Sequence, residues 1–146
     1  MLKKTLSVII VVVWCALIFN YSNQNGTSSK GKSDLVVNYI SDILKIKEEN
    51  RDKLTFPVRK CAHFFVYFIL GFLVANMFKT FNVKLSTILI ITCVFCMFYA
   101  IGDEIHQFFI QNRQARVSDV LLDTSASIFG TYLYFLLVRG RNEKNN

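Results

Sequence analysis

Four apolar stretches constrain the fold of this chain more than any other feature of its sequence. Each is long enough, or nearly so, to cross the hydrocarbon core of a bilayer, which is about 30 Å thick and needs roughly 20 helical residues. The stretches cover approximately residues 6–21, 62–78, 85–101 and 120–138. The sequence therefore predicts an all-α fold: a small polytopic membrane protein with about four transmembrane helices in a single domain, residues 1–146.

The first apolar stretch is expected to stay in the mature protein. Lys3 and Lys4 precede it, as basic residues precede the apolar core of a secretory signal peptide. The stretch ends at residues 20–24 (NYSNQ), without the small residues that mark a cleavage site. Cys93 and Cys96 have the spacing of a redox or zinc motif, but within an apolar stretch we interpret them as small hydrophobic residues.

Between the first two spans the sequence predicts a loop and then an amphipathic helix. Residues 22–32 are rich in Ser, Asn, Gly and Lys, which is typical of a solvated loop. Apolar residues recur at spacings of three and four over residues 33–49, with Ser33 as N-cap. We expect this helix to lie in the membrane interface or to cover the bundle. Pro57, which a first helical turn tolerates, predicts that the second transmembrane helix begins near it.

A group of polar residues marks the start of the second span. Arg59, His63 and Tyr67 are spaced by four residues and share one helix face, with Lys60 adjacent. Lysine near a helix end often extends to the lipid headgroups, which is the alternative explanation for Lys60. Two cations and an imidazole that enter the bilayer edge together nevertheless indicate a functional site, because unpaired polar groups there cost several kcal/mol.

A second polar group closes the third span. Asp103, His106 and Gln107 fall at positions i, i+3 and i+4 of a helix, and Glu104 is turned about 100° away. An acid and an imidazole one turn apart are typical of an acid/base dyad or of metal ligands. The pair supplies two ligands at most, so we predict neither a metal nor a cofactor.

The following loop and the fourth span complete the set with Arg113, Asp119 and Asp123. Asp119 lies near a helix N-terminus, where the helix dipole favours an acid, whereas Asp123 is a turn deeper and needs a partner. Four spans place residues 22–60 and 102–118 on the same side of the membrane. All of these polar residues are therefore expected to converge on one membrane face.

The distribution of basic residues suggests which face this is. Seven basic residues near the termini and in the 79–84 turn lie close to the spans, where the positive-inside bias acts, although the other side carries the remaining ten of the 17. We therefore expect both termini in the cytoplasm and the polar site at the outer face.

Three motifs occur in order along the chain. They are IFNYSNQ at residues 18–24, RKCAHF at 59–64, and DEIHQFF at 103–109, the last followed by Arg113 and by DVLLDT at 119–124. In this order and at these spacings they closely resemble the motifs of the VanZ-like family, and the resemblance extends over nearly the whole chain.

The sequence also departs from the family's pattern at three places. Family members commonly have Glu where Val66 stands, Pro-Gly where Gln111 and Asn112 stand, and Gly where Ala126 stands. The missing glutamate removes a candidate acid or counter-ion for Arg59. The remaining polar residues of the motifs are present.

The resemblance implies a multi-pass protein of the bacterial plasma membrane that influences susceptibility to lipoglycopeptides of the teicoplanin type. On this hypothesis the polar site acts on a membrane lipid or a lipid-linked envelope component, with a lipoglycopeptide as a further candidate partner. The ligand-binding residues would be Arg59, Lys60, Tyr67, Asp103, Gln107, Arg113, Asp119 and Asp123.

A membrane enzyme acting on a phosphate-bearing lipid is the alternative hypothesis. Glu104, His63 and His106 would then supply acid/base catalysis, and Arg59, Lys60 and Arg113 would clamp the phosphate. The sequence carries no phosphate-binding glycine loop or dinucleotide fingerprint, and no nucleic-acid role is expected. The net charge of +7 suits a surface of anionic lipids, and the oligomeric state stays open.

Overall fold

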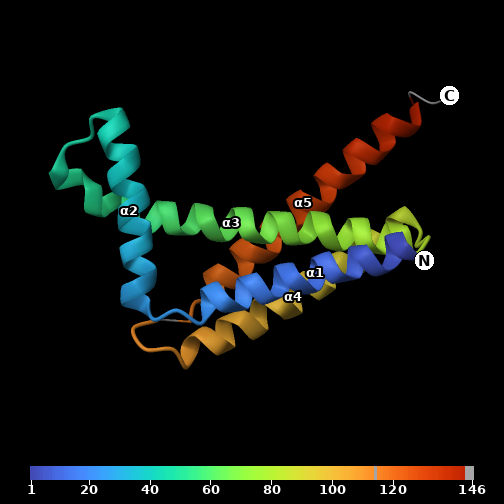
Figure 1. Ribbon diagram of the computed structural model, residues 1–146, viewed down its shortest axis with the longest axis horizontal. Coiled ribbons are helices and arrows are strands. Elements are labelled where there is room, and N and C mark those ends of the chain that lie inside the picture. The colour runs from blue at the N-terminus through green and yellow to red at the C-terminus, as the bar shows by residue number, and fades with distance from the viewer. Residues whose placement is uncertain (114, 144–146) are drawn as a thin grey trace.

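A computed structural model of the protein describes residues 1–113 and 115–143, and these residues form five α-helices and no strand. The helices are α1 (Leu2–Ser22), α2 (Gly26–Leu44), α3 (Glu48–Thr80), α4 (Leu85–Phe108) and α5 (Val117–Glu143) (Figure 1). Four of them, α1, α3, α4 and the Val117–Val138 part of α5, are long and apolar enough to cross a membrane. The predicted all-α architecture with four spans is confirmed.

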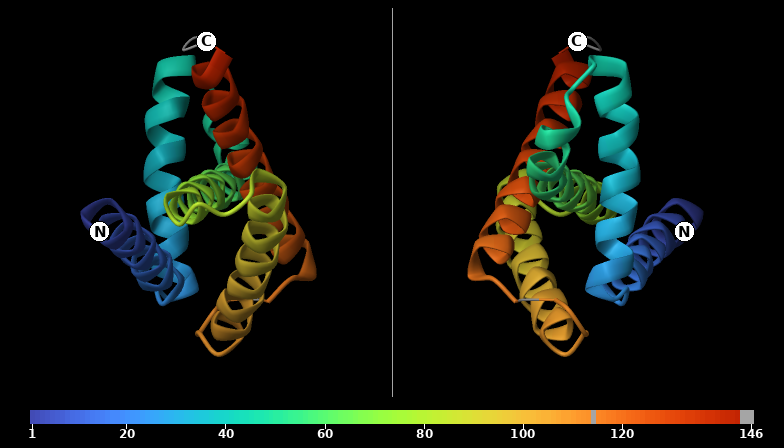
Figure 2. Two further views of the ribbon diagram at one scale, coloured as in Figure 1. Left: turned by 90° about the vertical axis from the view of Figure 1, so that its right-hand side faces the viewer. Right: turned by 90° about the vertical axis from the view of Figure 1, so that its left-hand side faces the viewer.

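Helices α1, α3 and α4 run lengthwise beside one another, α5 crosses α3 at a slant with its C-terminal part leading away from them, and α2 lies across the opposite ends (Figures 1 and 2). Helices α3 and α5 run in the same direction, and α1 and α4 run in the opposite one. The N-terminus and the α3–α4 turn are at one end, and α2 and the α4–α5 loop are at the other. We call this second end, made of α2, residues 109–116 and the adjoining ends of the spans, the α2 end.

Helix α2 corrects the predicted loop over residues 22–32 and the predicted helix over 33–49. The side chain of Asn25 accepts a hydrogen bond from the Ser28 N–H at 2.8 Å, so the helix begins seven residues before Ser33. Ser33 is inside the helix, where its hydroxyl donates to the Ser29 carbonyl at 3.2 Å. The helix ends where Lys45 adopts a left-handed conformation with φ of 54°.

The start of α2 is fixed against the α4–α5 loop. The Gly26 N–H donates to the Gln111 carbonyl at 3.0 Å. A Cβ at Gly26 would lie 1.8 Å from the Asn112 carbonyl oxygen, so only glycine permits this approach. Val37 and Ser41 are buried, while Leu35, Tyr39 and Ile43 are exposed. The exposed apolar side chains on a helix lying across the spans fit an interfacial position.

Helix α3 corrects the expected start of the second span. It begins at Glu48, nine residues before Pro57, so the proline lies inside the helix. Its first turns extend past the ends of the other spans and contact α2. Arg51 donates to Asp42 at 2.8 Å, and the Thr55 hydroxyl donates to Asp34 at 2.7 Å. Proline has no backbone N–H, so one hydrogen bond of the helix is missing at Pro57. The contacts with α2 help to stabilise this part of α3.

The closest packing in the bundle is between α3 and α5. A Cβ at Gly71 would lie 2.0 Å from the Ser127 carbonyl oxygen, and one at Gly130 would lie 1.9 Å from that of Phe68. Such backbone contact is the usual role of small residues between membrane helices. The Thr131 hydroxyl donates across the same contact to the Gly71 carbonyl at 3.3 Å.

The buried core is small, and most of the apolar surface faces outward. Tyr67, Leu70, Val74, Cys96, Ala100 and Ala126 form its centre. Many large apolar side chains are exposed, including Phe98 at 65% and Phe129 at 58%. Exposed apolar surface of this extent is expected where lipid replaces water as the solvent.

The α3–α5 contact predicts that glycine is required at Gly71 and Gly130. Replacing either with alanine should lower the free energy of unfolding by about 1–3 kcal/mol, because the added methyl group collides with backbone and not with a flexible side chain. Chemical denaturation in detergent micelles measures the change. Gly102→Ala is the matched control, since nothing lies within 4 Å of its added Cβ, and an equal loss in the control would contradict the prediction.

Candidate functional site

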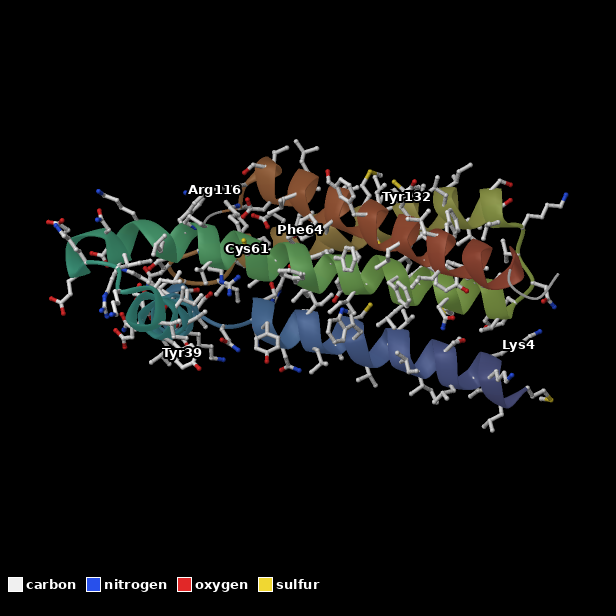
Figure 3. The ribbon with its side chains drawn as sticks, turned by 90° about the horizontal axis from the view of Figure 1, so that it is seen from above. Lys4, Tyr39, Cys61, Phe64, Arg116 and Tyr132 are labelled. Carbon is white, nitrogen blue, oxygen red and sulfur yellow. The ribbon has the colours of Figure 1, made fainter. Side chains whose placement is uncertain are left out.

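The predicted site residues gather at the α2 end of the bundle. Helix α3 supplies Arg59, Lys60, His63 and Tyr67, helix α4 supplies Asp103, Glu104, His106 and Gln107, the loop supplies Arg113, and α5 supplies Asp119 and Asp123. Figure 3 shows Cys61 and Arg116 toward this end, with Lys4 at the far end of the helices. The polar residues do not form one cluster but several, each with a distinct set of contacts.

A salt bridge and a histidine–aspartate contact join α3 to α5. Lys60 Nζ forms a hydrogen-bonded salt bridge with Asp119 Oδ1, which also accepts from the Ser118 hydroxyl at 3.1 Å. One turn deeper, His63 Nδ1 lies 3.6 Å from Asp123 Oδ2. Because α3 and α5 run in parallel, the two pairs succeed each other along the contact. They stabilise the buried carboxylates and fix the register of the two helices.

A third group is centred on Asp103, which is buried. Asp103 Oδ2 accepts hydrogen bonds from the Tyr67 hydroxyl at 3.3 Å and from Gln107 Nε2 at 2.9 Å. Its other oxygen, Oδ1, is buried and has no hydrogen-bond partner in the described part of the chain.

Glu104 and His106 face away from this group. Glu104 Oε1 accepts from the Arg116 backbone N–H at 2.5 Å, so the glutamate holds the loop that leads into α5. His106 stacks on Phe19 of α1 with ring centroids 4.6 Å apart, and its Nε2 lies 3.3 Å from Asn23 Oδ1. The three proposed acid/base residues, Glu104, His63 and His106, therefore point to three different neighbours.

Arg113 connects the loop to the end of α1. Its Nε donates to the Gln24 carbonyl at 3.0 Å and its Nη2 to the Tyr21 carbonyl at 3.1 Å. Cations are favoured at the C-terminal end of a helix, where carbonyl groups lack partners. Burial and the nearby charge of Arg59 lower the pKa of Arg113, so the two guanidinium groups form a site that an anion would stabilise.

The main cavity, of about 700 Å³, lies at the α2 end between α1, α2, α3 and α4. Its apolar wall includes Ile18, Val36 and Val66. Its polar lining consists chiefly of Lys32, Arg59, His63, Tyr67, Asp103, Gln107 and Arg113. Val66, where the resemblance of the motifs leads us to expect glutamate, thus lies on the wall of this cavity.

A second cavity, of about 450 Å³, adjoins the loop. It is lined by Phe56, Arg59, Lys60, Asn112, Arg113, Arg116 and Asp119, so Arg59 and Arg113 line both cavities. Glu104, His106 and Asp123 line neither of them.

Arg59 differs from the other cations of the site. Lys60 and Arg113 have the partners described above, and Arg116 lies over the ring of Phe56. Arg59 has no hydrogen-bond or ion-pair partner within residues 1–113 and 115–143. A partly buried guanidinium on the wall of two cavities is positioned to bind an anionic ligand.

Sequence reasoning missed the contribution of α2 to the main cavity. Ser29, Lys32 and Ser33 line it together with Val36 and Ile40. The first two fell in the segment predicted as a loop. The signal that was available is Asn25, a residue type favoured at helix N-caps, after which Lys32 falls on the helix.

The structure also shows no preformed metal site. No group of three or more His, Cys, Asp or Glu side chains in the described residues is arranged to hold a metal ion. All four cysteines are free, with Cys61 exposed and Cys96 buried.

The fold and the site define a class: a four-span helical membrane protein with a cation-lined cavity at one end of the bundle. A family model described as VanZ/LLP1 matches residues 7–138, and the chain belongs to this family. The match extends from the first span to the end of the last and includes every residue of the site. No curated protein and no solved structure matches the chain.

The Lys60–Asp119 and Arg51–Asp42 pairs predict unequal effects of neutralising charges at this end. Lys60→Gln leaves the largely buried carboxylate of Asp119 without its cation, and because the Lys60 side chain is itself 22% exposed we expect the free energy of unfolding to fall by about 1–3 kcal/mol. Asp42→Asn removes a pair in which the acid side chain is 68% exposed, and the loss should stay below about 1 kcal/mol. Denaturation in detergent micelles compares them, and similar losses would show that the Lys60–Asp119 pair is not a buried interaction.

Proposed function

We propose that the protein binds a phosphate-bearing membrane lipid or a lipid-linked envelope precursor in the main cavity, and that this binding changes bacterial susceptibility to lipoglycopeptides of the teicoplanin type. The proposal has two parts. The geometry of the α2 end supports the ligand site, and the resemblance of the site's motifs to the VanZ-like family supports the cellular effect.

The observation that carries the ligand site is that Arg59 has no hydrogen-bond or ion-pair partner among residues 1–113 and 115–143. A polar network that only holds helices together is expected to pair its charges, as Lys60 and Asp119 do. Arg59 instead lies on the walls of both cavities, beside Arg113. An anion bound there would be held by two guanidinium groups, whose planar donors match phosphate oxygens.

The apolar wall of the main cavity supports a lipid rather than a free anion. Ile18, Val36 and Val66 offer hydrocarbon contacts next to the guanidinium groups. An amphiphile could therefore place its phosphate against Arg59 and its hydrocarbon against this wall.

Arg59→Gln tests the proposed ligand site. It should weaken binding of a short-chain phosphatidylglycerol to the purified protein by roughly tenfold or more, because a charge-assisted interaction is lost. Native mass spectrometry in detergent measures the binding. The same variant expressed in cells should lose any effect of the protein on the minimal inhibitory concentration of teicoplanin.

Lys53→Gln is the matched control, since it removes the same charge from the same end, and Lys53 is exposed, with its ammonium donating to the Asn50 side chain at 3.1 Å. Equal binding by wild-type protein and Arg59→Gln, with folded yield preserved, would reject the site. Unchanged susceptibility despite lost binding would reject the cellular effect alone.

A membrane enzyme acting on the same kind of lipid is the second candidate, and one observation favours it. His63 lines the main cavity and has a carboxylate, Asp123, beside Nδ1, an arrangement that orients an imidazole for proton transfer. Catalysis predicts that His63→Gln abolishes the cellular effect while lipid binding persists. If the protein only binds the lipid, any change in antibiotic susceptibility caused by His63→Gln should be accompanied by a matching change in lipid binding.

The orientation we propose places the α2 end outside the plasma membrane and the termini in the cytoplasm, following the basic residues close to the spans at the other end. In a background without cysteine, a membrane-impermeant maleimide should label Lys47→Cys in intact cells and Lys84→Cys only after permeabilisation. Both positions are exposed, the first beside α2 and the second in the α3–α4 turn. The reverse labelling pattern would invert the proposed topology.

A further inference from the structure

The second cavity is polar, whereas the main cavity is apolar. Apolar atoms form most of the surface of the main cavity, and polar atoms form the larger part of the surface of the second. The polar side chains of the second cavity are accessible to a ligand. Asn112 and Arg116 are exposed, and Arg59, Lys60 and Arg113 are partly buried. The proposed function assigns no part of the ligand to this second cavity.

Positive charge is in excess in the lining of the second cavity. Among the residues that the structure describes, four basic residues line it against a single acid, and that acid, Asp119, forms the salt bridge with Lys60. The other basic residues of the lining are Arg59, Arg113 and Arg116. Burial and the nearby charge of Arg59 lower the pKa of Arg113, so like charges already lie close together here. An anion in the second cavity would stabilise this cluster.

The two cavities share Arg59 and Arg113, so these side chains lie at the border between them. The residues of α3 follow the same order: Val66 and Tyr67 line the main cavity and lie deeper along the helix than Lys60, which lines the second. A phosphate bound by the two guanidinium groups therefore has an apolar cavity on its deeper side and a basic cavity on its outer side. A group attached to the outer side of that phosphate would lie among cations.

We infer that the ligand carries two linked phosphate groups, as the headgroup of a lipid diphosphate does. The phosphate joined to the lipid binds Arg59 and Arg113, and the terminal phosphate enters the second cavity beside Lys60 and Arg116. A terminal phosphate adds at least one negative charge and three strong acceptor oxygens, which suit the planar donors of arginine. The inference rests on the proposed function and specifies the chemical class of its ligand.

The test uses the full chain in detergent and three lipids built on the same short-chain diacylglycerol: phosphatidylglycerol, phosphatidic acid and diacylglycerol pyrophosphate. Native mass spectrometry identifies the lipid bound from an equimolar mixture. We expect the pyrophosphate lipid to bind roughly tenfold more tightly than either monophosphate lipid, because further charge-assisted hydrogen bonds form.

Arg116→Gln tests the second cavity by itself, because Arg116 lines this cavity and not the main one. The preference for the pyrophosphate lipid should fall to about threefold or less, while binding of the two monophosphate lipids is unchanged. The substitution keeps the backbone N–H that donates to Glu104. Lys53→Gln is the control, since Lys53 is exposed at the same end and lines neither cavity, and it should leave the preference unchanged.

Inorganic pyrophosphate distinguishes a lipid headgroup from a free anion. It leaves the apolar cavity empty, so we expect it to displace the pyrophosphate lipid only at concentrations roughly tenfold or more above that of the lipid. Displacement at equal concentration would overturn the lipid as the source of the diphosphate.

The outcomes separate this inference from the proposed function. Equal binding of the three lipids by the wild-type protein would overturn the diphosphate site, whether or not Arg116→Gln folds. An unchanged preference in Arg116→Gln, or an equal fall in Lys53→Gln, would also overturn it. If Arg59→Gln still weakens all three lipids, the proposed phosphate site stands without the second cavity. If Arg59→Gln changes the binding of none, the proposed function and the inference both fail.

Discussion

Helices α3 and α5 touch backbone to backbone at Gly71 and Gly130, and the arrangement of the site depends on this contact. Because the two helices run in parallel, close approach at the glycines brings the first turns of α5 beside the corresponding turns of α3. Lys60 then meets Asp119, and His63 meets Asp123 one turn deeper. Small residues in the middle of the bundle thus set the positions of charged residues at its end.

The charges at the α2 end differ in how far the described part of the chain supplies them with partners. Lys60 and Asp119 join α3 to α5, and Glu104 binds the backbone of the loop before α5. Arg113 donates two hydrogen bonds to carbonyls at the end of α1. Among residues 1–113 and 115–143, Arg59 is not used in this way, and it lines the main cavity. A buried polar group costs free energy unless a hydrogen bond or an ion pair satisfies it. A cavity residue without such a partner is therefore a candidate for binding a ligand.

The sequence predicted the spans and the convergence of polar residues, because apolar length and the alternating direction of spans determine both. It misplaced α2, since a helix rich in Ser and Gly depends on the Asn25 cap and on contacts with α3 that no local pattern reveals. His106 was expected beside Asp103, yet three residues along a helix leave a rotation of about 60°, enough to face α1. Gln107, at the next position, stays with Asp103.

The α2 end also has an unusual balance of charge. Nine of the ten acidic residues of the chain belong to it: Asp34, Asp42, Glu48, Glu49, Asp52, Asp103, Glu104, Asp119 and Asp123. They offset its ten basic residues almost completely, so this end produces little net electric field beyond the Debye length, about 10 Å at ordinary ionic strength. Arg59 and Arg113 therefore do not attract distant anions. Their attraction for an anion acts mainly at short range, where screening by salt is weakest.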